Sequence, residues 1–309
     1  MNLFFSSFIF YLSSFDLSTF QVTINSMPHK YTAHFAVRHY ELDLHGELPN
    51  STLQRLCQET AMQASTDAGF GAQYYLEHNS VWVIHQMTLE HARPIHYLDE
   101  LAITTWVSDF QRVRSHREYL ARNVATNEIV ARGRAYWAHL NRETLMPMRI
   151  PVDLSTLIAA DGIRAVTHTQ PRNFAAPPFA FPDYRTTRRV FRYEADEMQH
   201  VNNAMYIDWL EEALNDAITD SSTPSSTRIA RSESAQSHKR LCVYRHDIEY
   251  MRSALPGDDV DILVRLVGVG QTASAWNLEI TRNGESVVKD HITALWVNSA
   301  GKPVRWKIL

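Results

Sequence analysis

Two stretches of this chain decide its fold: RHYELDLHGELPNSTLQRLCQETA at residues 38–61 and FRYEADEMQHVNNAMYIDWLEEAL at residues 191–214. They align with a constant offset of 153 residues, which places Tyr40 and Asp43 over Tyr193 and Asp196. Further along, the offset becomes 159, and the added length falls in the Ser-rich stretch SSTPSSTRIARSESAQS, which only the second copy contains. The sequence therefore predicts one module written twice, a fused pseudo-dimer with a site at or near its internal interface.

Size and composition restrict the class of protein. A chain of 309 residues suits two domains, and 45% hydrophobic with 21% charged residues is ordinary for a soluble globular protein. A net charge of −4 argues against a nucleic-acid partner, because phosphate affinity comes mainly from Lys and Arg. The two cysteines, Cys57 and Cys242, lack CxxC spacing, so we expect no disulfide framework and a reducing, cytoplasmic compartment.

Four segments are expected along the chain. Residues 1–32 form an N-terminal extension outside the fold, residues 33–150 the first module, residues 151–185 a linker with five of the twelve prolines, and residues 186–309 the second module. The first 26 residues are apolar, but serines and Asp16 interrupt them short of the roughly 20 apolar residues that span a bilayer. We expect no stable membrane insertion of this segment and take Met27 as the true initiator. The alternative is a segment that lies on a membrane surface.

Each module reads as one helix followed by strands. Helical spacing predicts helices over residues 50–68, capped by Asn50 or Ser51 and ended by Gly69, and over residues 203–218. Extended segments are predicted at residues 81–90, 100–110, 115–123, 128–140, 241–250, 259–269, 274–283 and 286–298. Asn283-Gly284 is a strong signal for a type I′ hairpin. The predicted fold is α+β, a tandem double hotdog in which each long helix is wrapped by an antiparallel sheet and the two sheets pair into one.

These motifs resemble the acyl-acyl carrier protein thioesterases of the bacterial and plant type. The similarity rests on YELDLHGEL and the QETA and AGFG that follow, on MTLEHARPIHYLDELAITTW, on HVNNAMYIDWLEEAL and on IEYMRSALPGDDV. It implies hydrolysis of a fatty acyl thioester to free fatty acid in fatty acid biosynthesis. The implied partner is an acyl carrier protein with its phosphopantetheine-linked acyl chain, and no cofactor is implied.

The family signature implies which residues do the chemistry. It reads D-x-N-x-H with a later Glu or Cys, and here Asp196 and His200 match the Asp and the His. Met198 occupies the Asn position, and Ser253 and Ala254 occupy the later positions. A thioether cannot donate a hydrogen bond, and losing one oxyanion donor typically slows such enzymes about 100- to 1,000-fold.

The residues themselves support a thioester site ahead of the second helix. His200 is the candidate base or water holder, Asp196 orients it or activates water, and the amides near Asn202, Asn203 and Ala204 are candidate oxyanion donors. Glu249 is a candidate second carboxylate. The alternative makes Asp196 and His200 turn residues, Asn203 a helix N-cap and Glu249 the structural counterpart of Glu90.

The first module offers a rival site. Asp43, His45 and Glu47 alternate, so they face one way if extended. Asp43 followed by Gly46 resembles the catalytic aspartate of the 4-hydroxybenzoyl-CoA branch of hotdog thioesterases. The alternative is a solvated loop ahead of a helix. Glu59 and Glu212 lie mid-helix at matching positions, where a structural or exposed role is the commoner one.

Substrate contacts are expected in the first module. Apolar residues of the helix and first strand are candidates for an acyl pocket: Leu53, Leu56, Met62, Trp82 and Ile84. Met198 would also contact substrate. A run of arginines between residues 106 and 135 predicts a basic face for an acidic carrier protein, with a solvated strand face as the alternative: Arg112, Arg114, Arg117, Arg122, Arg132 and Arg134.

Several alternatives stay open. We expect no metal, because no His pair or Cys/His cluster has the spacing of metal ligands. A serine hydrolase is not expected either, because the sequence contains no Gly-x-Ser-x-Gly elbow. An acyl-CoA thioesterase and a non-catalytic acyl-thioester binder are the rival functions. Acyl chain length, carrier preference and pairing into a homodimer are not determined by the sequence.

Overall fold

The computed structural model describes residues 29–154, 162–167, 174–178, 180–219, 240–298 and 301–305. The predicted extension and the Ser-rich insertion lie outside these residues, apart from the last few residues of the extension. The chain divides into two compact units. The N-terminal unit consists of Phe4–Met87 and Ile95–Thr167, and the C-terminal unit contains Thr88–Pro94 and His168–Leu309.

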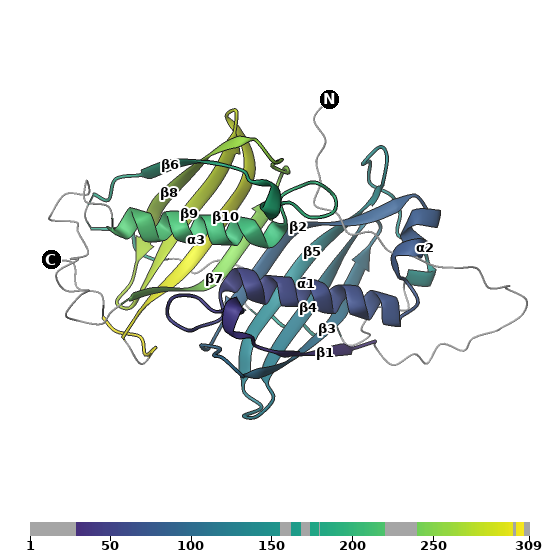
Figure 1. Cartoon of the computed structure of the whole chain (residues 1–309), viewed down its shortest axis with the longest axis horizontal. Helices are drawn as coiled ribbons and strands as arrows, with labels where there is room; N and C mark the ends of the chain where they lie inside the picture. Colours follow the sequence, from purple (N-terminus) through teal and green to yellow (C-terminus); the bar gives the residue numbers. More distant parts are fainter. Residues whose placement is uncertain are drawn as a thin grey trace, which may run out of the picture. The chain divides into compact units, whose positions relative to one another are not determined.

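The N-terminal unit has a long helix against an antiparallel sheet (Figure 1). Its elements are β1 (Tyr31–Ala36), α1 (Asn50–Asp67), α2 (Ala72–Glu77), most of β2 (Ser80–His91), β3 (Glu100–Gln111), β4 (Arg114–Asn123) and β5 (Ile129–Asn141). The strand order is β1-β3-β4-β5-β2, and α1 packs on β1 and β3. This is the predicted hotdog arrangement.

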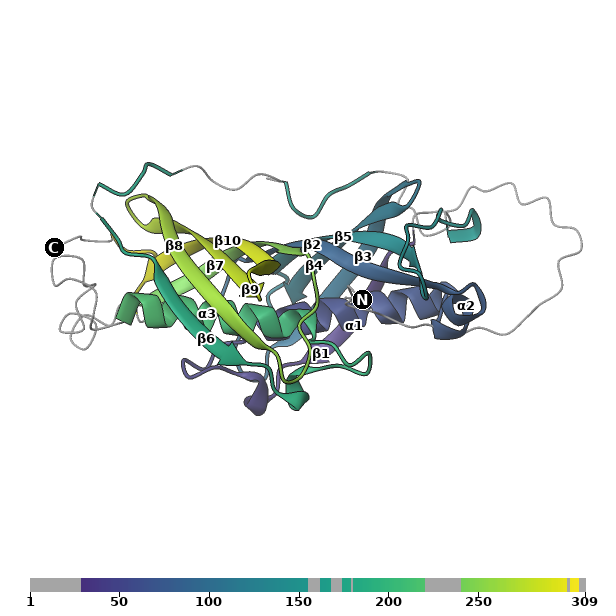
Figure 2. The same cartoon turned by 90° about the horizontal axis from the view of Figure 1, so that it is seen from above.

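The C-terminal unit repeats the plan (Figure 2). Its elements are β6 (Tyr184–Arg189), α3 (Asn203–Thr219), β7 (Arg240–Tyr250), β8 (Asp259–Val269), β9 (Ala273–Arg282) and β10 (Glu285–Val297). The strand order is β7-β10-β9-β8-β6, and α3 packs on β7 and β8. A one-turn 3₁₀ helix precedes the long helix in both units, at His39–Glu41 and Arg192–Glu194.

Most predicted elements are confirmed to within a residue or two. The type I′ hairpin is present, because Asn283 and Gly284 both have positive φ, at 52° and 78°. Capping of α1 by Asn50 or Ser51 is wrong: the N-cap is Pro49, which makes no side-chain hydrogen bond. The edge strands β1 and β6 were not predicted, because each has only six residues and every second side chain is exposed.

The core of each unit lies between its helix and its sheet. Leu53 of α1 and Ile103 of β3 are fully buried in the N-terminal unit, and Leu210 of α3, Trp276 and Ile280 are fully buried in the C-terminal unit. Each such side chain contributes roughly 1.5–3 kcal/mol through burial. None of the helices that the structure describes is long and apolar enough to cross a membrane.

Residues 163–166 of the linker pack against the N-terminal unit. Ala165 and Val166 are buried, the Ala165 amide donates to Glu118 Oε2 at 3.0 Å, and Trp106 Nε1 donates to the Ile163 carbonyl at 2.8 Å. Arg132 donates to the Ala165 carbonyl at 3.2 Å. This segment therefore belongs to the packed structure of the N-terminal unit.

Candidate active site

A closed turn precedes α3 and carries both family-matched residues. In this C-terminal Asp loop (residues 195–201), the Asp196 amide donates to the His200 carbonyl at 2.8 Å, and the Gln199 amide donates to the Asp196 carbonyl at 2.9 Å. The Asp196 carboxylate accepts the Met198 amide at 3.0 Å. Asp196 thus folds the loop on itself, as Asx residues do in turns.

The N-terminal unit builds the same turn. In the N-terminal Asp loop (residues 42–48), the Asp43 amide donates to the Glu47 carbonyl at 2.8 Å and its carboxylate accepts the His45 amide at 2.8 Å. Gly46 has φ +75°, and its counterpart Gln199 has φ +63°. The turn is therefore a property of the repeated module, and the rival trio is not one extended face: Asp43 holds a tight turn.

Environment separates the two loops. Asp43 and His45 are exposed, whereas Asp196 and His200 are half-buried. Burial raises the pKa of Asp196, against the opposing effect of amide hydrogen bonds from Met198 and His200. Burial lowers the pKa of His200, which keeps its ring neutral at pH 7 and able to accept a proton. Only the C-terminal loop thus has a partly desolvated carboxylate and base.

The start of α3 uses its polar groups internally. Asn202, not Asn203, caps the helix, because its Oδ1 accepts the Ala204 amide at 3.0 Å. The Asn202 amide donates to the Glu194 carbonyl at 3.0 Å. Two of the amides expected to bind an oxyanion are therefore already engaged. Asn203 is buried, and its carbonyl lies 3.4 Å from the Tyr250 hydroxyl, which donates to it.

The residues in the later signature positions lie beside this loop. The Ala254 carbonyl accepts the Val201 amide at 3.0 Å, and the Ala254 amide donates to the Tyr206 hydroxyl at 2.9 Å. Ser253 is buried next to it. The position where the family carries Glu or Cys is thus next to the Asp loop in space, and here it presents Ser253 and Ala254.

Glu249 does not join this group. Tyr250 and Ile248 are buried on the helix side of β7, so strand alternation puts Glu249 on the opposite face. There it lines an open, polar depression with Asp247 and Lys289. The expectation that Glu249 is a second carboxylate at the helix start is wrong for this geometric reason. Its counterpart Glu90 instead accepts from Arg245 at 2.6 Å.

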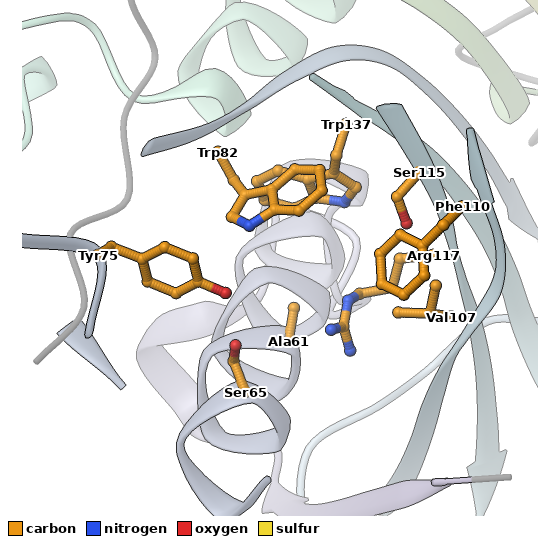
Figure 3. Close-up of a pocket in the computed structure, with 9 residues that line it drawn as sticks. All are labelled: Ala61, Ser65, Tyr75, Trp82, Val107, Phe110, Ser115, Arg117 and Trp137. Carbon is orange, nitrogen blue, oxygen red and sulfur yellow. The ribbon is translucent and has the colours of Figure 1, made fainter. Parts of the chain in front are cut away.

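The N-terminal unit contains a small pocket between α1 and the sheet (Figure 3). Trp82 lines it, as expected, together with Ala61, Tyr75, Phe110, Trp137 and Arg117. Leu53 is fully buried core and Leu56 half-buried, and neither is among the residues that line it. Of the five residues predicted to line an acyl pocket, only Trp82 lines this one.

The expected basic face is split. Arg117 and Arg134 are buried, the latter 3.0 Å from Glu118, so neither is available to a docking carrier protein. Arg112 and Arg114 flank the β3–β4 turn, where Arg114 donates to Gln111 and Tyr136. Strand alternation sends Arg117 toward α1 and Arg122 to the other face, which the sequence run of arginines conceals.

A buried ion network in the C-terminal unit was missed. His246 of β7 is fully buried between Asp290 of β10 at 2.6 Å and Glu211 of α3 at 2.9 Å. The sequence signal that could have revealed this network was the presence of His246 and Asp290 at inward positions of apolar strands.

The two mid-helix acids considered from the sequence, Glu59 and Glu212, are both exposed. Among the described residues, no group of His, Cys, Asp and Glu could hold a metal ion.

Comparisons with known proteins agree with the architecture. Solved structures with the same fold include an acyl-ACP thioesterase from Bacteroides thetaiotaomicron (TM-score 0.64, 18% identity, 87% of this chain, 98% of that one). Another is the 12:0-ACP thioesterase from Umbellularia californica (TM-score 0.68, 17% identity, 87% and 94%). At these identities the likeness establishes the fold, so the chain is a double-hotdog protein.

Sequence comparison gives the family. Residues 28–158 match the model of the acyl-ACP thioesterase N-terminal domain, and residues 191–307 match the thioesterase-like superfamily. Residues 28–158 thus belong to the acyl-ACP thioesterase family, and the second module belongs to the wider thioesterase-like superfamily. Relatives from Arabidopsis thaliana are oleoyl-acyl carrier protein thioesterase 2 (23% identity, 62% of this chain, 55% of that protein) and palmitoyl-acyl carrier protein thioesterase (26%, 58%, 46%), both chloroplastic. The chain thus spans about half the length of the curated relatives it matches.

Proposed function

We propose that this protein hydrolyses fatty acyl thioesters on acyl carrier protein and releases free fatty acid in fatty acid biosynthesis. One observation carries the proposal: His200 and Asp196, the residues matching the family signature, sit half-buried on the Asp loop that leads into α3. Family membership of both modules supports the reaction class.

In the proposed mechanism His200 is the general base. Its lowered pKa leaves the ring neutral, so it takes a proton from water as the oxygen attacks the thioester carbonyl. The carbon–sulfur bond then breaks, His200 returns the proton to the departing sulfur, and a fatty acid and a thiol leave. Asp196 orients His200 or polarises the water itself. Met198 would contact the substrate, and Asn202 and Asn203 would hold the helix start in place.

The substrate and its surroundings are proposals of the same kind. Acyl carrier protein presents the chain on phosphopantetheine, with Arg112 and Arg114 as candidate docking cations and the pocket beside Trp82 as a candidate acyl site. A reducing, cytoplasmic location fits Cys57 and Cys242, which form no disulfide with each other. Association into a homodimer is an open element of the proposal.

Thiol release tests the function directly. We expect purified protein to release thiol from acyl carrier protein thioesters faster than from the matching acyl-CoA thioesters, across a series of chain lengths. His200→Ala should lower kcat by about 100-fold or more while leaving the unfolding transition unchanged. Faster turnover of acyl-CoA would favour the acyl-CoA thioesterase, and an unaffected His200→Ala variant would remove His200 from the mechanism.

A second candidate is a non-catalytic acyl-thioester binder. It is favoured by Met198, Ser253 and Ala254, which replace three polar or reactive family positions around the Asp loop. Tight binding of acyl thioesters without thiol release would support it. Met198→Asn separates the two: a gain of about 100-fold in rate would identify a weakened enzyme, and no gain would favour the binder.

A further inference from the structure

The pocket of the N-terminal unit has a charged end. Arg117 lines it from β4, and Figure 3 shows its guanidinium projecting toward α1, which carries Ala61 and Ser65. The Tyr75 hydroxyl points into the same space, and Ser115 lies on the same strand face as Arg117. Aromatic rings of Trp82 and Trp137 cover the rest (Figure 3). The lining is therefore apolar on its sides and polar around one cation.

Arg117 has no anionic partner among the residues that the structure describes. It is 9% exposed, and the hydrogen bond from its Nη1 to Thr105 Oγ1 is long, at 3.5 Å. Burial lowers its pKa, with no nearby carboxylate to oppose the effect. The other buried arginines differ: Arg134 meets Glu118 at 3.0 Å and Arg245 meets Glu90 at 2.6 Å. A buried guanidinium is costly unless an anion pairs with it.

The duplication provides an internal comparison. With the offset of 159, Arg117 corresponds to Trp276 and Ser115 to Ser274. Trp276 is fully buried, and its Nε1 donates to Ser274 Oγ at 2.8 Å. The second module thus fills this position with an indole whose N–H is hydrogen-bonded within the same strand. The first module keeps a cation and an open space in the same place, so the space is not an unavoidable feature of the fold.

We propose that this pocket receives an acyl group whose far end carries a carboxylate, with Arg117 as the group that binds it. The substrate class is a dicarboxylic acyl thioester, which rests on the thioester hydrolysis proposed above. Arg117 offers a planar fork that matches a carboxylate in two parallel hydrogen bonds, and Tyr75 and Ser65 supply neutral donors. A terminal methyl would leave the guanidinium buried and unpaired.

The size of the cavity fits an end group. Its volume of about 40 Å³ holds a few water-sized groups. That is room for a carboxylate and a short piece of chain, beside the rings of Trp82 and Phe110. Arg117 is in this sense a specificity-determining residue, and the class of reaction that supplies its substrate must leave a free acid at the far end of the chain.

Calorimetric binding tests the proposal without turnover. The probes are monomethyl esters of linear dicarboxylic acids and, as the matched pair, methyl esters of the monocarboxylic acids of equal length. We expect the carboxylated ester to bind about 10- to 100-fold more tightly, the range of one charged hydrogen-bonding pair. Arg117→Gln should abolish the preference, and Arg185→Gln, at an exposed position of β6, should preserve it.

Each result of these experiments either supports or overturns the proposed anion site. Equal binding of the two esters by the unmodified protein, which needs no variant and no folding control, overturns the proposal. An Arg117→Met variant that keeps the preference for the carboxylated ester overturns it as well, because Arg117 would then not be the group that binds the carboxylate. Preference for the carboxylated ester in a protein that releases no thiol would sustain the anion site and defeat the proposed hydrolysis, so the two failures are distinguishable.

Discussion

At the scale of residues, the duplicated Asp loops show how one backbone serves two environments. Asp43 and Asp196 make matching hydrogen bonds, and Gly46 and Gln199 share a left-handed φ. The differences lie in the side chains that surround this scaffold. His200 replaces Glu47, and the loop of the second module is half-buried. Chemistry is proposed only where the environment shifts the pKa of the groups.

Exchanging the charge of each loop aspartate for an amide separates structure from catalysis. Asn keeps an acceptor oxygen for the turn, so Asp196→Asn and Asp43→Asn should both fold. We expect Asp196→Asn to lower kcat/KM for acyl thioesters by about 10-fold or more, and Asp43→Asn to leave it unchanged. Equal effects in steady-state kinetics would mean that the aspartates serve only the turn.

At the scale of elements, the ion network fixes α3 to its sheet. Burial alone would lower the pKa of His246, but the charge of Asp290 and hydrogen bonds to Asp290 and Glu211 raise it to about 10. The equivalent positions in the first module are Met87, Ala131 and Gln58. An ion network thus contributes to the contact between helix and sheet in the C-terminal unit, whereas uncharged side chains occupy the same positions in the N-terminal unit.

This difference predicts a pH dependence of stability. Because the folded pKa of His246 lies above its unfolded value of about 6.5, its contribution is complete below that pH and is lost as the pH rises toward 10. Urea unfolding should therefore give a free energy of unfolding that falls between pH 7 and 10. His246→Met, which lacks the titrating ring, should show a flatter curve.

The first module supplies the control for that network. His246→Met alone removes the cation that Asp290 and Glu211 share and should lower the free energy of unfolding by about 3–5 kcal/mol at pH 7. Adding Asp290→Ala and Glu211→Gln copies the first module and should restore most of the loss. If the triple variant were no more stable than the single one, uncompensated charge would not be the cause.

At the scale of the whole molecule, the two units divide the proposed work. The C-terminal unit holds the partly desolvated Asp196 and His200, and the N-terminal unit holds the pocket and the exposed turn of Arg112 and Arg114. The modules also differ in what fills the space under their helices. Because each unit is stabilised by its own core, one copy of a duplicated module can specialise in binding and the other in catalysis.

Carrier docking is testable at this scale. Arg112→Glu with Arg114→Glu should raise KM for acyl carrier protein thioesters by about 10-fold and leave acyl-CoA turnover unchanged, because steering acts on an acidic protein. The same preference should weaken with added salt. Initial rates at two ionic strengths measure both. A matched loss on acyl-CoA would indicate damage to the fold instead of a docking surface.

Helix periodicity and turn signals are local, and the repeat shows each of them twice. They were therefore enough to predict the duplicated module, both long helices and eight strands, and the motifs predicted the family. The sequence by itself did not determine faces. Glu249, Arg117 and the oxyanion amides turned out differently because strand alternation and hydrogen bonds across the chain decide which way a group points. Only the tertiary structure brought His246 to Asp290 and Glu211, and only it left Arg117 buried without an anion among the described residues. Such pairings depend on strand register, and register is set by packing of the whole sheet.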